Sequence, residues 1–145
     1  MTVRRMDNVG IVFEDLEAAI AFFVELGLEV EGRAQVSGEF ADQCVGLEGI
    51  RCDIAMLRTP DGHSRLELSR YVTPAVLEAP LKQPHNTVGM HRVMFAVDGL
   101  EDVIERLGKH GAELLGSIAR YEDSYKLAYI RGPEGIIVGL AEQLA

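Results

Sequence analysis

The chain opens with a hydrophobic pattern that predicts a strand followed by a helix. In residues 8–14 every second residue is apolar, which is the period of a half-buried strand. From Leu16 to Leu26 apolar residues recur three and four positions apart, the spacing of an amphipathic helix. We expect Asp15 to cap the start of this helix and Gly27 to end it.

The same pattern returns 84 residues later in the chain. Residues 91–97 alternate again, and apolar residues follow at helical spacing until Gly111, the expected helix end. Asp98 and Glu101 have the spacing of a capping box. The shift superposes Val9 on Val93, Ile11 on Phe95, Phe13 on Val97, Leu16 on Leu100, Glu17 on Glu101, Ile20 on Ile104 and Gly27 on Gly111. The sequence therefore contains an internal repeat.

Each copy of the repeat continues with three further strand-like runs. They cover residues 28–36, 50–59 and 64–72 in the first copy, and 113–119, 125–132 and 136–142 in the second. A turn with Pro and Gly precedes the last strand of each copy, "TPDG" in the first and "GPEG" in the second. Each copy is therefore predicted to be a strand–helix–strand–strand–strand module.

These modules organise the whole chain. We expect one domain over residues 1–145, with a first module at 6–72, a second at 89–142 and a linker at 73–88 that holds three of the five prolines. The stretch 37–49 interrupts the first module and is expected to lie over one mouth of any cleft.

The paired modules resemble the vicinal oxygen chelate superfamily. This superfamily holds glyoxalase I, methylmalonyl-CoA epimerase, extradiol dioxygenases, fosfomycin-resistance enzymes and bleomycin-binding proteins. The resemblance rests on "DNVGIVFEDLEAAIAFF", "TPDGHSRLEL", "RVMFAVDGLEDVIERL" and "RGPEGIIVGLAEQL". It implies an α+β fold in which two tandem βαβββ modules form a curled mixed sheet around a cleft. It also implies a homodimer.

Composition narrows the possible partners. The chain is 48% hydrophobic and 26% charged, with a net charge of −9, so nucleic acid and anionic membranes are not expected as partners. No apolar run suits a signal peptide or a membrane span, and we expect a cytoplasmic protein. Cys44 and Cys52 lack CxxC spacing and are expected to be thiols in a reducing compartment.

Strand alternation indicates which residues face the expected cavity. The apolar set of each first strand should pack on its helix, leaving Asn8 in one module and Arg92 and Met94 in the other on the cavity side. By the same alternation, Glu67 and Gly139 in the two last strands face the cavity.

The resemblance assigns metal ligands to four positions, which here are Asn8, Glu67, Arg92 and Gly139. Glu67 is a good ligand, whereas the Asn8 carbonyl suits only a hard cation. Arg92 is permanently cationic and Gly139 has no side chain, so neither can bind a metal. A divalent metal cofactor is therefore left open, with Glu67 and Asn8 as its ligands if one is bound.

Two histidines and one carboxylate near these positions have alternative interpretations. Parity puts His91 on the helix side of its strand, although a bulge would bring it into the site. His63 is either a turn residue or part of the cavity mouth. Glu142 lies three residues past Gly139 and should point to the opposite face, so it is not expected to replace a ligand.

Candidate substrate-binding residues are Asn8, Arg92, Met94, Tyr125, Tyr129 and Arg131. Arg92 either neutralises Glu67 or binds an anionic ligand through its guanidinium. Tyr125, Tyr129 and Arg131 alternate on one strand face, which offers aromatic walls and a cation if that face lines the cavity.

The sequence supports two hypotheses for the function of the protein. The first is a glyoxalase-like lyase or isomerase that acts on a small oxygenated metabolite, with Glu67 as the catalytic carboxylate that moves a proton. The second is a small-molecule-binding or sequestering protein of the bleomycin-resistance type, which needs a shaped cavity and no metal. In both, the expected ligand is small and anionic.

Overall fold

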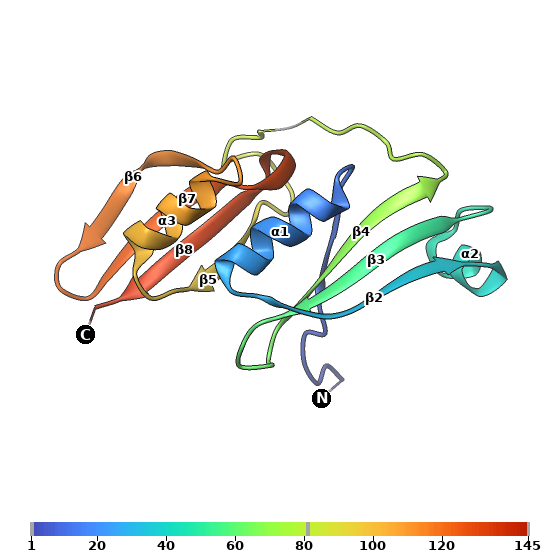
Figure 1. The fold of residues 1–145 in the computed structure, drawn as a ribbon, viewed down its shortest axis with the longest axis horizontal. Coiled ribbons are helices and arrows are strands. Elements are labelled where there is room, and N and C mark those ends of the chain that lie inside the picture. The colour runs from blue at the N-terminus through green and yellow to red at the C-terminus, as the bar shows by residue number, and fades with distance from the viewer. Residues whose placement is uncertain (1, 81, 145) are drawn as a thin grey trace. The chain divides into compact units, whose positions relative to one another are not determined.

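A computed structural model describes residues 2–80 and 82–144, which form two compact units that divide between Glu78 and Ala79 (Figure 1). The first unit consists, in chain order, of β1 (Val9–Val12), α1 (Leu16–Leu26), β2 (Glu29–Ser37), α2 (Glu39–Val45), β3 (Arg51–Arg58) and β4 (Arg65–Thr73). The second consists of β5 (Arg92–Ala96), α3 (Leu100–Gly108), β6 (Glu113–Tyr121), β7 (Tyr125–Arg131), a short 3₁₀ turn η1 (Pro133–Gly135) and β8 (Ile137–Gln143).

The two units share one sheet topology. The strand order is β1-β4-β3-β2 in the first unit and β5-β8-β7-β6 in the second. β1 pairs with β4 in parallel, as β5 does with β8, and all the other pairs are antiparallel. The predicted tandem βαβββ fold is confirmed, as two separate four-stranded mixed sheets that are not closed into one.

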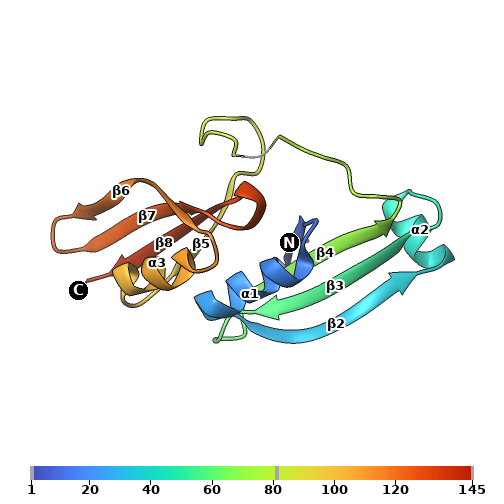
Figure 2. The ribbon, with the colours of Figure 1, turned by 45° about the horizontal axis from the view of Figure 1, so that its top comes forward.

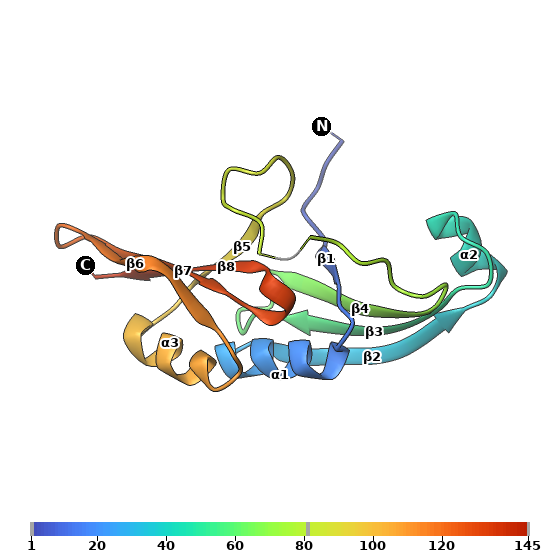
Figure 3. The ribbon, with the colours of Figure 1, turned by 90° about the horizontal axis from the view of Figure 1, so that it is seen from above.

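A helix covers one face of each sheet. Figure 3 shows α1 against the first sheet and α3 against the second. The side chains that alternate toward the helix in β4, Leu66 and Leu68, are 5% and 0% exposed, as expected for a hydrophobic core. The opposite, open face of each sheet carries the candidate site residues, because successive side chains in a strand point to opposite faces.

The ends of α1 follow the sequence prediction. The Asp15 carboxylate accepts a hydrogen bond from the Ala18 N–H at 3.0 Å, and Gly27 ends the helix with a φ of 125°. A positive φ of this kind favours glycine, which has no Cβ to clash.

The start of α3 differs from the sequence prediction. The N-cap residue is Gly99, and no side-chain hydrogen bond caps the helix at this position. The expected capping box at Asp98 and Glu101 is therefore wrong. Instead, the Glu142 carboxylate in β8 accepts hydrogen bonds from the N–H groups of Gly99 and Leu100, at 2.7 and 3.1 Å. The helix also ends at Gly108, before Gly111, which lies in the following turn.

The stretch at 37–49 contains a helix that the sequence pattern did not reveal. Figure 2 shows α2 at the end of the first sheet where β2 leads into β3. The Asp42 side chain accepts hydrogen bonds from the N–H groups of Gly49 and Ile50, both at 2.9 Å. These bonds hold the connection between α2 and β3.

Candidate ligand-binding site

The first unit presents Glu67 on its open sheet face. In the register of the sheet, Glu67 of β4 lies between Gly10 of β1 and Met56 of β3. The side chain is half-buried, and no hydrogen bond or ion pair joins it to another residue in the described part of the chain. Asn8 directly precedes β1 and is exposed. Glu67 is therefore an available carboxylate on this face.

The groups beside Glu67 are neutral at pH 7. Ser69 follows on the same face and is buried, and Tyr71 lies opposite Cys52 in the sheet register. Burial raises the pKa of the Cys52 thiol and the pKa of the Tyr71 hydroxyl, and the nearby Glu67 charge adds to both shifts. Neither Cys52 nor Tyr71 therefore adds a negative charge near Glu67 at pH 7.

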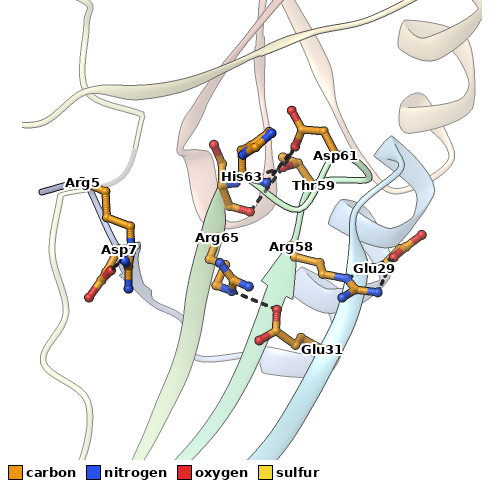
Figure 4. Close-up of polar contacts among 10 residues, drawn as sticks. Arg5, Asp7, Glu29, Glu31, Arg58, Thr59, Asp61, His63 and Arg65 are labelled. Carbon is orange, nitrogen blue, oxygen red and sulfur yellow. Dashed lines mark hydrogen bonds and ion pairs between the residues drawn. The ribbon is translucent and has the colours of Figure 1, made fainter.

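The arginines near the turn end of this sheet pair with carboxylates other than Glu67 (Figure 4). Arg65, two residues before Glu67, donates to the Glu31 carboxylate at 2.9 Å, and Arg58 donates to Glu29 at 3.2 Å. His63 lies in the turn between β3 and β4, where its backbone N–H donates to Asp61 at 3.0 Å. Arg65 is therefore not positioned to neutralise Glu67.

In the second unit, Met94, Gly139 and Tyr129 lie in one row across the open face. The register pairs Met94 of β5 with Gly139 of β8, and Gly139 with Tyr129 of β7. A Cβ added to Gly139 would lie 2.7 Å from Cε of Met94 and 3.1 Å from Cε1 of Tyr129. The position that the resemblance assigns to a metal ligand is thus already filled by two neighbouring side chains.

Arg92 lies beside this row with its guanidinium over an aromatic ring. Its Cζ is 5.1 Å from the centre of the Tyr129 ring, a cation–π distance. His85 meets the same ring edge-on, with the two ring centres 4.7 Å apart. The ion pairs among the described residues of this unit do not include Arg92. The guanidinium is therefore oriented by Tyr129 and is not neutralised by a carboxylate of its own unit.

Arg131 and Tyr125 share this face but are engaged elsewhere. Arg131 donates to the backbone carbonyls of Gly135 at 3.0 Å and Gln83 at 2.8 Å, so it ties residue 83 and the turn before β8 to β7. Tyr125 stacks on Tyr121, with ring centres 5.5 Å apart. It lies about 13 Å along β7 from Tyr129, given about 3.3 Å per residue. The structure brings together Arg92, Met94 and Tyr129, and leaves Tyr125 apart from them.

A pocket of about 580 Å³ opens beside Arg92. It is lined by His85, Asn86, Thr87, Val88, Gly89, His91 and Arg92. His91 precedes β5, so strand parity does not decide its direction. Most of the lining comes from the predicted linker, residues 73–88, from which no site residue was predicted. The pair His85 and His91, within seven residues of each other, was the feature of the sequence that could have indicated this pocket.

The second unit does not fit a divalent metal at the positions that the resemblance assigns. Arg92 is a fixed cation, and Gly139 has neither a side chain nor room for one. Within either unit, no group of three or more His, Cys, Asp or Glu side chains among the described residues could hold a metal ion. Glu67 is the strongest donor of the four assigned positions.

Among the described residues, no helix is long and apolar enough to span a membrane.

Both the sequence and the fold of the chain are similar to those of known proteins. The sequence model of the Glyoxalase/Bleomycin resistance protein/Dioxygenase superfamily matches residues 7–129. The crystal structure of a glyoxalase family protein from Bacillus cereus is 52% identical, with a TM-score of 0.96, covering 100% of this chain and 97% of that chain.

More distant structures share the fold alone. A glyoxalase family protein from Enterococcus faecalis is 20% identical, with a TM-score of 0.64, covering 98% of this chain and all of its own. The trypanothione-dependent glyoxalase I from Leishmania major is 18% identical, with a TM-score of 0.64, covering 97% of this chain and 87% of that chain. Among curated proteins, none matches the sequence.

Proposed function

Because the chain belongs to the glyoxalase/bleomycin resistance protein/dioxygenase superfamily, we propose that it binds a small organic anion without a metal ion, with Arg92 as the anchoring cation. The observation that carries this proposal is the Arg92 guanidinium held over Tyr129, beside a Gly139 position that Met94 and Tyr129 fill. A cation therefore stands where metal-dependent relatives are expected to carry a ligand.

The chemistry of the guanidinium supports an anionic ligand. Arginine stays charged throughout the physiological pH range and binds carboxylate or phosphate oxygens in a bidentate geometry. The stacking on Tyr129 limits its conformational freedom, which reduces the entropy lost when a ligand binds. The chain as a whole has a net charge of −9, so general charge attraction does not explain anion binding.

The proposal is tested by thermal denaturation of chelator-treated protein with a panel of organic anions. A ligand at 100 times its Kd stabilises the folded state by about 2.7 kcal/mol, which is an easily measured shift in Tm. We expect Arg92→Gln to remove the shift. The matched control is Arg120→Gln, which removes one charge at the β6–β7 turn, where Arg120 pairs with Asp123. Retention of the shift in Arg92→Gln, or its dependence on added divalent metal, would contradict the proposal.

A second candidate function is a lyase or isomerase in which Glu67 moves a proton. It is favoured by the half-buried Glu67 carboxylate, which has no hydrogen-bond or ion-pair partner among the described residues. Exchange of the α-proton of hydroxy-ketone and 2-oxo-acid substrates in D₂O, followed by NMR, tests this function. Catalysed exchange lost in Glu67→Gln would support it, and exchange no faster than buffer would reject it.

We also propose that the protein is a homodimer in the cytoplasm. The outermost strands β1, β2, β5 and β6 support self-association, because a sheet edge presents backbone groups for pairing. The free thiols Cys44 and Cys52 suit a reducing compartment. Light scattering should give twice the 15.9 kDa of one chain, and a monomer at micromolar concentration would reject the dimer.

A further inference from the structure

The pocket beside Arg92 offers more hydrogen-bond donors than a single carboxylate can use. Its lining residues include Arg92, His85, His91, Asn86 and Thr87, whose side chains carry guanidinium, imidazole, amide and hydroxyl donors. No acidic residue is among its described lining residues, although the chain has 23 acidic residues against 14 basic ones. The pocket is therefore a locally electropositive, donor-rich site in an acidic protein.

The number of donors distinguishes between the two common organic anions. A carboxylate has two oxygens, and one guanidinium satisfies both in a bidentate contact. A phosphate monoester has three terminal oxygens and carries a charge of about −1.5 to −2 at pH 7. The imidazole, amide and hydroxyl donors beyond Arg92 match the additional oxygen.

From this match we propose that the pocket at residues 85–92 binds the phosphate group of a small phosphorylated metabolite. The inference rests on the proposed function, because Arg92 is the anchor in both. It assigns a new role to His85 and His91, which provide the donors that favour phosphate over carboxylate. The pocket volume of about 580 Å³ leaves room for the organic part of such a ligand.

The wall of the pocket is held in place by contacts from the sheet. Arg131 donates to the Gln83 carbonyl at 2.8 Å, and the Thr87 N–H donates to the Pro84 carbonyl at 3.1 Å, which closes a turn. His85 packs edge-on against Tyr129, the ring that also carries Arg92. Arg92 and His85 therefore contact the same ring, and both line the pocket. Arg131 is a positioning residue for this wall.

The test compares two ligands with the same aromatic group, phenyl phosphate and benzoate. Their affinities for chelator-treated full-length protein are measured by ligand-observed NMR at pH 7. The variants are His85→Gln, His91→Gln, the double variant and Arg92→Gln. His63→Gln is the matched control, because His63 is an exposed histidine in the turn between β3 and β4 of the first unit. Circular dichroism verifies the folding of each variant, and the single variants replace the double one if it fails to fold.

We expect the wild-type protein to prefer phenyl phosphate by about tenfold, the value of one added charge-assisted hydrogen bond. The double variant should lose this preference, because the glutamine amides do not place a donor where the imidazole N–H groups lie. It should keep its benzoate affinity within about twofold, because the Arg92 guanidinium alone satisfies both carboxylate oxygens. His63→Gln should match the wild type.

The other outcomes separate the two proposals. Equal affinity of the wild-type protein for the two ligands, or an unchanged phosphate preference in the double variant, would overturn the phosphate inference and leave anion binding by Arg92 standing. Absence of binding by either ligand, or full binding of both by Arg92→Gln, would overturn the proposed function together with the inference.

Discussion

Replacement of Gly139 by alanine should destabilise the protein, whereas the same replacement at Gly10 should not. Both glycines lie on the open faces of strands, and neither has a φ in the left-handed region. The new Cβ at 139 would meet Met94 Cε at 2.7 Å, Tyr129 Cε1 at 3.1 Å and Met94 Cβ at 3.2 Å. At Gly10 no atom lies within 4 Å of the added Cβ. The two substitutions therefore differ in available space.

The size of the change in the free energy of unfolding follows from two opposing effects. Forcing a methyl group into a filled site costs about 1–3 kcal/mol, since the Tyr129 ring and the Met94 Cβ must both move. Alanine also reduces the entropy of the unfolded chain, which stabilises the folded state by about 0.4–1 kcal/mol. Gly139→Ala should thus lower the free energy of unfolding by about 1–2 kcal/mol, and Gly10→Ala should raise it by up to about 1 kcal/mol.

Urea denaturation followed by circular dichroism gives both values. Combining Gly139→Ala with Met94→Ala removes the closest of the three contacts, the one with Met94 Cε, so the double variant should recover about 1 kcal/mol relative to the sum of the single variants. Gly139→Ala as stable as Gly10→Ala, or a double variant with purely additive effects, would refute the account of a filled ligand position.

Three further predictions concern the helix cap, the pocket wall and the thiols. Hydrogen bonds from the Gly99 and Leu100 N–H groups and from Lys126 hold the pKa of Glu142 below its usual range, so the contribution of Glu142 to stability is present above about pH 4.3 and disappears as pH falls further. Glu142→Gln should therefore lower the urea midpoint at pH 7 and flatten this pH dependence. An unchanged pH profile would refute this role of Glu142. Arg131→Ala removes hydrogen bonds to two carbonyls and should reduce stability by about 2 kcal/mol while speeding hydrogen exchange in residues 83–91, and unchanged exchange there would contradict its role. With a thiol reagent at pH 8, exposed Cys44 should react at least about tenfold faster than Cys52, whose pKa burial raises; equal rates would contradict this.

Much of the fold could be predicted because local pattern and tertiary packing agree. The alternation of Val9, Ile11 and Phe13 and the helical spacing after Asp15 recur 84 residues later, and the eight described strands lie within one or two residues of the expected ranges. A strand buried on one face must alternate, so this signal survives in the sequence.

The features that the sequence did not reveal depend on residues far apart in the chain. Glu142 caps a helix that begins 42 residues earlier, and no local motif records such a partner. The short helix α2 has no buried residues, so it lacks the apolar stripe on which a helix prediction rests.

The candidate site was predictable in part. The sequence indicates that Gly139 lacks a side chain, but only the register reveals that Met94 and Tyr129 occupy its space. The pocket wall carries prolines typical of a linker, and its order comes from the long-range contacts of Arg131 and His85.

We expect this protein to bind an organic anion at Arg92 without a metal. The most direct test is an NMR titration of chelator-treated, isotope-labelled protein with phenyl phosphate, following the backbone amides and the Arg92 side chain. We expect the largest chemical-shift changes at residues 85–92 and Tyr129. Shifts that appear only after a divalent metal is added, and that centre on Glu67, would contradict it.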